Sequence, residues 1–261
     1  MSSDSNVRGG APATRRAGAG LKTAVLCLLV ACVAVGAFAE GSAEQRFPGE
    51  GREFPYQGFT AVETGWGIDV NIEQSDAWHV ALFADPELED RIVVEKVGRT
   101  LQIGLRDFPF PFPIWRHGRA HVEIAMPVLE QVKASGGARV VVRMDVRDGD
   151  VRASLSGGSG ISGTLRCRDL SIDGSGGSSA RLEGSADTLT LHGSGGATCT
   201  MPDFSVREAD IRLSGGSSAR LSVDQSLSVR ASGGSHVVYH GSPSIDRQSL
   251  NGGSWIRSEG D

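Results

Sequence analysis

A glycine pair, usually preceded by serine, recurs through the second half of the chain and limits its possible folds more than any other feature. The pairs begin at Gly136, Gly157, Gly176, Gly195, Gly215, Gly233 and Gly252. The step from one pair to the next is about 19 residues, and such a constant spacing is typical of repeat architectures.

Apolar and polar residues alternate within each repeat. The position four residues before each of the first six pairs is always apolar, and it is occupied by Val132, Ala153, Ile172, Leu191, Ile211 and Val229. An alternation of two predicts strands with one buried face. Because the same phase returns in every repeat, the chain can coil so that each turn lies beside the previous one. We therefore predict an all-β fold with a parallel β-solenoid of about seven coils over residues 132–258.

Each predicted coil needs two corners. The glycine pairs supply the first, because glycine adopts the positive φ angles of a tight turn. A second corner is expected at Gly184, Pro202, Asp224 and Gly241. A single coil buries too little apolar surface to fold alone, so stacking has to supply the missing contacts.

Residues 58–131 are predicted to form an N-terminal β-rich part without this period. The expected strands are residues 59–74, 78–84, 91–97, 100–106 and 119–126, with a hairpin turn at Gly98 and a helical turn at residues 86–90. We expect antiparallel strands that pack against the first coil or continue it. Residues 40–57 contain glycine, proline and charge without periodicity, which indicates a linker.

The first 39 residues have the pattern of a signal peptide. Arg15, Arg16 and Lys22 precede an apolar run over residues 24–38, which ends in Ala37-Phe38-Ala39. We predict cleavage after Ala39 and export to the periplasm, outer membrane or cell surface. A lipoprotein with Cys32 acylated is the alternative, because residues 29–32 resemble a lipobox, and an uncleaved anchor is a third reading.

Composition excludes several function classes. The net charge is −5 without a basic block, which disfavours nucleic-acid binding. Cys167 and Cys199 lie at different phases of the repeat, so no disulfide is expected between them. The six histidines lack the ligand spacing of a metal site. No cofactor, metal or catalytic residue is predicted.

Two columns of charge recur on the outward positions of the repeat. Asp173, His192, Arg212 and Arg230 share one column, which is either a solvated face or the acid, base and arginine of a polysaccharide lyase or hydrolase. We prefer the interpretation of this column as a solvated face. Arg181, Arg220 and Arg257 share the other column, which either solubilises the protein or binds anionic glycans or lipopolysaccharide phosphates.

An aromatic and proline-rich stretch lies between two predicted strands. Its large apolar residues are Phe108, Phe110, Phe112 and Trp115, and three prolines separate them. Proline removes backbone donors, so this segment is not a central strand. It is expected either to cap the open end of the solenoid or to contact a partner, a glycan or a membrane.

The order of these patterns resembles a known bacterial family. Val122-x-Ile124-x-Met126-Pro127 leads through Val132 to Ser135-Gly136, and the Gly-Ser-Gly-Gly turns follow. This order, over residues 59–256, is similar to the family called "putative autotransporter adhesin, head GIN domain". The resemblance implies a secreted or surface-attached right-handed β-helix, shaped like pectin lyases but without their catalytic residues, with an adhesive role.

The combined prediction is an exported, non-enzymatic envelope or surface protein with an adhesin-like binding domain. Its partner is unknown from sequence, and a glycan or a cell-surface protein fits such a surface. The alternatives are a polysaccharide lyase or hydrolase on the solenoid face, and a periplasmic structural scaffold.

Overall fold

A computed structural model describes residues 51–106 and 120–260 of the chain. All of these residues belong to one compact unit. Its N-terminal strands are β1 (Arg52–Glu53), β2 (Ala61–Thr64), β3 (Asp69–Gln74), β4 (His79–Ala84), β5 (Ile92–Val97), β6 (Thr100–Leu105), β7 (Ala120–Met126) and β8 (Gln131–Ala134). Its later strands are β9 (Arg139–Leu155), β10 (Gly160–Gly174), β11 (Ser179–Gly193), β12 (Thr198–Leu213), β13 (Ser218–Ala231), β14 (His236–His240), β15 (Ser244–Leu250) and β16 (Trp255–Ser258).

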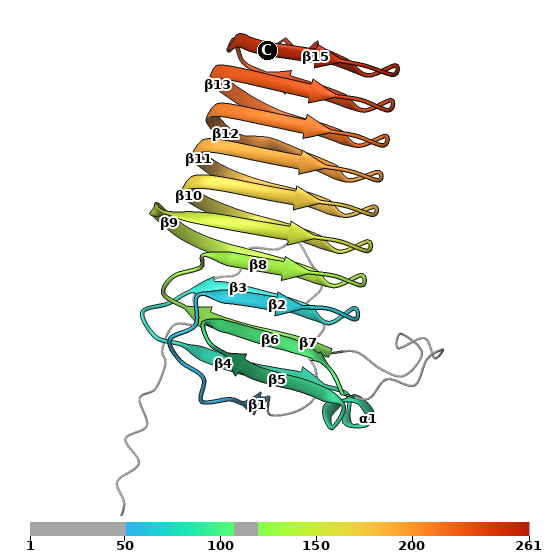
Figure 1. The fold of residues 1–261 in the computed structure, drawn as a ribbon. Coiled ribbons are helices and arrows are strands. Elements are labelled where there is room, and N and C mark those ends of the chain that lie inside the picture. The colour runs from blue at the N-terminus through green and yellow to red at the C-terminus, as the bar shows by residue number, and fades with distance from the viewer. Residues whose placement is uncertain (1–50, 107–119, 261) are drawn as a thin grey trace, which may run out of the picture. The chain divides into compact units, whose positions relative to one another are not determined.

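The later strands wind as a parallel β-solenoid of about seven turns (Figure 1), which confirms the predicted fold class. Each of β9 to β12 pairs in parallel with the strand that follows it. Ile172 lies opposite Leu191, and Leu191 lies opposite Ile211. All three side chains are at most 2% exposed, so the predicted inward column faces the core and its members stack in sequence.

The glycine pairs form the corner that the sequence predicted. The first glycines have φ angles of 57–66° and the second glycines 77–85°, a region that side chains with a Cβ atom rarely occupy. From Gly157 to Gly252, a Cβ on the first glycine would also lie only 3.0–3.4 Å from the backbone nitrogen of the glycine one turn earlier. Both the backbone conformation and this close approach therefore favour glycine.

Coil stacking begins earlier than the glycine pairs indicate. β2 pairs in parallel with β8, and β3 pairs in parallel with β9. Trp66 (φ 61°) and Gly67 (φ 75°) form the corner between β2 and β3, and a Cβ on Gly136 would lie 3.1 Å from the nitrogen of Trp66. The single strand predicted over residues 59–74 is thus wrong: it is two strands on either side of a corner.

The chain leaves the solenoid after β3 and returns at β8. Within this excursion β6 pairs in parallel with β2, and β7 pairs in parallel with β3. β5 is antiparallel to β6, which confirms the predicted hairpin at Gly98, and β4 is antiparallel to β7. α1 (Pro86–Glu89) lies between β4 and β5 at the expected helical turn. β1 falls in the segment predicted as linker and pairs with β4.

The second corner is a bend within continuous strands rather than a loop. β11 and β12 run through it, and their pairing shifts register between Ala180 and Gly184. The pairing of β12 with β13 shifts between Met201 and Ser205. These irregularities lie at the predicted corner positions Gly184 and Pro202.

Candidate functional site

A groove of about 910 Å³ follows the solenoid from coil to coil, beside the strand segments that lead into the glycine corners. We call it the axial groove. In these segments the side chains three and one residues before the first glycine point outward, whereas the residue between them turns inward. The groove lies over that intermediate row of small and aliphatic residues, which are Thr64, Ala134, Leu155, Gly174, Gly193, Leu213 and Ala231.

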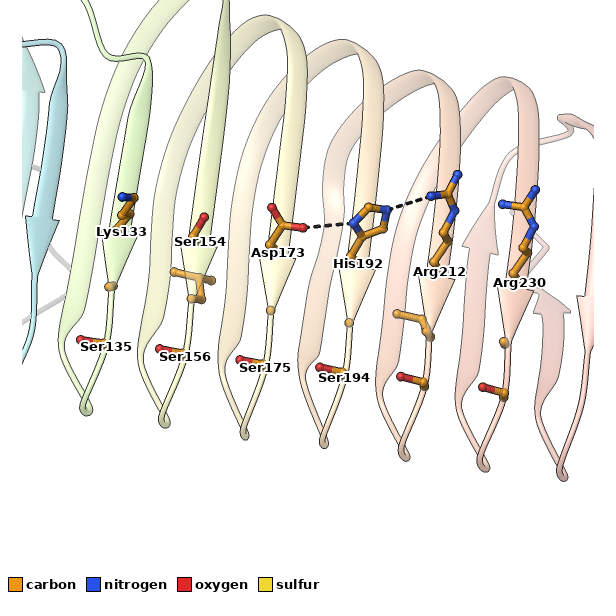
Figure 2. A pocket seen from close by; sticks show the side chains of 18 of the residues that line it. Lys133, Ser135, Ser154, Ser156, Asp173, Ser175, His192, Ser194, Arg212 and Arg230 are labelled. Carbon is orange, nitrogen blue, oxygen red and sulfur yellow. Dashed lines mark hydrogen bonds and ion pairs between the residues drawn. The ribbon is translucent and has the colours of Figure 1, made fainter.

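Two outward rows line the axial groove (Figure 2). The charged column consists of Glu63, Lys133, Ser154, Asp173, His192, Arg212, Arg230 and Ser249. The serine column consists of Ser135, Ser156, Ser175, Ser194, Ser214 and Ser232, and Asn251 continues it. Adjacent coils are about 4.8 Å apart, so the groove offers a hydroxyl and a second polar group at nearly every step.

Asp173, His192 and Arg212 form a hydrogen-bonded chain across three coils (Figure 2). His192 Nδ1 lies 3.0 Å from Asp173 Oδ1, and Arg212 Nη1 lies 3.4 Å from His192 Nε2. With its proton on Nδ1, the imidazole donates to Asp173 and accepts from Arg212. Both ring nitrogens are then occupied within the protein, and neither is free to take a proton from a substrate.

Further ion pairs anchor this chain at both ends. Arg152 Nε lies 3.5 Å from Asp173 Oδ2. Arg212 Nη2 donates to Asp210 Oδ2 at 2.9 Å. Asp173 and Arg212 are therefore each held by two neighbours, and the middle of the charged column is internally neutralised.

Arg230 differs from the other charged members of the column. Lys133 Nζ lies 4.0 Å from Glu63 Oε2, and Asp173, His192 and Arg212 are paired as described. Arg230 forms no ion pair or side-chain hydrogen bond with any described residue. Its neighbour across β12 and β13 is Arg212, which carries the same charge. One guanidinium of the axial groove is thus left without a carboxylate.

The column of Arg181, Arg220 and Arg257 lies outside the axial groove. Each residue follows its glycine corner by five positions, and all three side chains are exposed. Arg220 pairs with Glu259. Thr200 and Val238 are the register partners of Arg220, so the three arginines stand on alternate coils, as predicted, and lie apart from the first column.

Several predicted site residues lie outside the described residues. Phe108, Phe110, Phe112 and Trp115 belong to residues 107–119, which join β6 to β7 in the chain. Cys32 and the cleavage position after Ala39 also lie outside the described residues.

Both cysteines of the described region are buried free thiols. Burial raises the pKa of Cys199 to about 12. Burial, followed by the nearby carboxylate of Asp169, raises the pKa of Cys167 to about 12 as well. Thiols protonated at neutral pH are poor nucleophiles and poor metal ligands, so neither cysteine offers a reactive site.

The serine column was not predicted from the sequence as a binding feature. The serine before each glycine pair marks the period, and the recurrence of a hydroxyl at this outward position is the sequence signal that points to the column. A second serine row, two residues after the first glycine, was not predicted either, and it consists of Ser159, Ser178, Ser217 and Ser235. These side chains are at most 1% exposed and lie inside the corner, so they do not line the groove.

The described residues include no group of three or more His, Cys, Asp or Glu side chains placed to hold a metal ion. No helix among them has the length and apolar character needed to cross a membrane.

Solved structures of proteins from Bacteroides and Parabacteroides species have the same fold. A "putative adhesin" from Bacteroides fragilis has a TM-score of 0.67 and 18% identity, over 80% of this chain and 95% of that one. A "putative adhesin" from Parabacteroides merdae has a TM-score of 0.58 and 19% identity, over 80% and 95%. A "putative lipid binding protein" from Parabacteroides distasonis has a TM-score of 0.60 and 18% identity, over 80% and 96%. At this identity the likeness shows the fold alone.

No curated protein matches the chain. A family model does, over residues 58–243, which is most of the sequence and includes both the N-terminal excursion and the solenoid. The chain therefore belongs to the family described as "Putative auto-transporter adhesin, head GIN domain".

Proposed function

We propose that this protein is an exported, non-enzymatic envelope or surface protein that binds a glycan or a cell-surface partner in the axial groove. The observation that carries the proposal is the groove itself, about 910 Å³ in volume and lined on successive coils by hydroxyls and charged groups. A long polar groove with a regular step suits a polymer of repeating hydroxylated units. The family and the solved structures called adhesins support a surface role.

Binding can be tested directly with the secreted chain on a glycan array and on intact cells. The expected result is retention of specific glycans and loss of that retention when Ser175, Ser194 and Ser214 are changed together to leucine, which is bulkier and has no hydroxyl. A matched control changes Ser185, Ser222 and Ser226, which lie outside the groove lining. Absence of binding to every glycan and every cell type would refute the proposal.

A polysaccharide lyase or hydrolase is the second candidate, because Asp173 and His192 form a 3.0 Å contact in the groove. The engagement of both His192 nitrogens argues against it. The wild-type chain is expected to release no unsaturated or reducing ends from polysaccharides. Cleavage that disappears in His192→Ala would instead establish the enzyme. A structural scaffold without a ligand is the third candidate, and it predicts no binding in the array.

Export is part of the same proposal. We expect the mature protein to begin at Glu40, after cleavage behind Ala39, which N-terminal sequencing of the exported protein measures. A lipoprotein would instead begin at Cys32, incorporate labelled palmitate and lose the label in Cys32→Ala. Full-length protein retained in the cytoplasm would contradict both routes.

A further inference from the structure

We infer that Arg230, assisted by Arg212, binds the acidic group of an anionic glycan in the axial groove. This inference rests on the proposed function and names the ligand class of the same site. Arg230 is a half-buried residue, and its side chain has no partner among the described residues although every other charged member of the column has one.

The charge of the groove is uneven along the solenoid. Glu63 and Lys133 neutralise each other near one end. Asp173 is held by Arg152 and His192 in the middle. Beyond Arg212, which Asp210 neutralises, Arg230 leaves an unbalanced positive charge. The protein as a whole has a net charge of −5, so this local excess runs against the overall charge.

Arg212 and Arg230 are direct register partners on adjacent strands, and both side chains point out of the ribbon into the groove (Figure 2). Like charges directly opposite each other destabilise a sheet. An anion placed between them removes that repulsion and adds charge-assisted hydrogen bonds. A guanidinium binds a planar carboxylate through two parallel N–H···O bonds, which suits the acid group of a uronic acid.

The neighbouring hydroxyls fit the rest of such a ligand. Ser214 and Ser232 lie two residues beyond Arg212 and Arg230 on the same coils and line the same groove. Hydroxyls both donate and accept hydrogen bonds, which matches the alternating requirements of sugar hydroxyls. An extended uronate polymer can therefore place a carboxylate at the arginine pair while its other rings follow the serine column toward Ser175 and Ser156.

The test measures binding of a galacturonic acid hexamer to the secreted chain, with a cellulose-derived glucose hexamer as the neutral comparison. We expect the acidic hexamer to bind more tightly and to weaken as salt concentration rises, because salt screens the charge interaction. In Arg230→Gln its affinity should fall by about tenfold to a hundredfold. Arg230→Lys should recover only part, since lysine keeps the charge and loses the planar fork.

Arg91→Gln is the matched control, because Arg91 is exposed, precedes β5 and lies outside the groove lining. It makes the same charge change and should leave binding unaltered. Equal affinity for both hexamers, or an unchanged affinity of Arg230→Gln for the acidic hexamer, overturns the inference. If the chain still binds neutral glycans in that case, the proposed function stands. No binding of any array glycan refutes both. Salt dependence of the wild-type chain remains decisive if Arg230→Gln fails to fold.

Discussion

Ser159 and Ser178 occupy the same position in successive glycine corners but differ in their hydrogen bonds. Ser159 Oγ donates to the Ala134 carbonyl at 2.8 Å and accepts from the Ser156 N–H at 3.0 Å. Ser178 Oγ is buried and has no hydrogen-bond partner among the described residues. Alanine fits sterically, because Ala138 and Ala197 occupy this position in other corners and are buried. Comparing these two serines therefore separates the contribution of hydrogen bonds to stability from the contribution of side-chain volume.

Ser159→Ala is expected to lower the free energy of unfolding by about 1–2 kcal/mol, because it removes two buried hydrogen bonds of the hydroxyl, one to the Ala134 carbonyl and one from the Ser156 N–H. Ser178→Ala should be neutral or slightly stabilising, since it removes a buried hydroxyl that makes no hydrogen bond. Urea denaturation of the two variants measures the difference. Equal losses in both would mean that hydrogen bonding does not distinguish the two corners.

Gly184 is required by space as well as by its backbone angle. Its φ is 125°, and a Cβ there would lie 2.1 Å from the Leu165 carbonyl oxygen, a backbone atom in the adjacent coil. Gly177 also has a positive φ, 78°, but an added Cβ would meet no atom within 4 Å. Gly184 pairs in register with Phe204 of the next coil, which is fully buried. The backbone at Gly184 therefore has little freedom to shift.

Gly184→Ala should therefore destabilise the protein by about 3–5 kcal/mol, the sum of backbone strain and overpacking. Gly177→Ala should cost only about 1–2 kcal/mol from strain alone. Thermal melting of both variants compares them. A Gly177 variant as damaged as the Gly184 variant would show that close approach between coils adds nothing at this corner.

At the scale of the strand, pairing on one side or on both should decide how readily the backbone opens. β11 is bonded to β10 and to β12 over most of its length. Among the described strands, β15 pairs with β13 alone, and six of its seven residues are exposed. Hydrogen exchange is therefore expected to be much slower in β11 than in β15. Mass spectrometry of peptic peptides tests this, and equal protection of the two strands would contradict it.

The same strands show which parts of the fold and of the candidate site could be predicted from the sequence. The inward column of Ile172, Leu191 and Ile211 was predictable, because coils with equal periods put equal phases on one side. The coil of β2 and β3 was missed, since Trp66 holds a positive φ where later coils have glycine. The axial groove forms where two outward rows flank an inward row of small residues. The lack of a partner for Arg230 among the described residues depends on the directions of the side chains around it. Neither follows from periodicity.

For the described part of the molecule as a whole, the solenoid should tolerate removal of one entire coil. Each coil contacts mainly its two neighbours, so stability is close to a sum of coils and their interfaces. Deleting Gly176 to Ser194 removes 19 residues and joins Ser175 directly to the next glycine pair. It places Ile172 beside Ile211, and Asp173 beside Arg212, which replaces the His192 link by a direct pair of opposite charge.

The shortened protein is expected to fold, with an unchanged far-UV circular dichroism signature of β-structure and a lower melting temperature, because one interface is lost. Deleting only Gly176 to Gly184 removes half a coil, and every later inward residue would then lie half a coil away from its column. That variant should be insoluble or sensitive to trypsin. If the half-coil deletion folds as well as the whole-coil deletion, the alignment of the inward apolar columns between coils does not govern the fold, because that deletion moves every later inward residue out of its column.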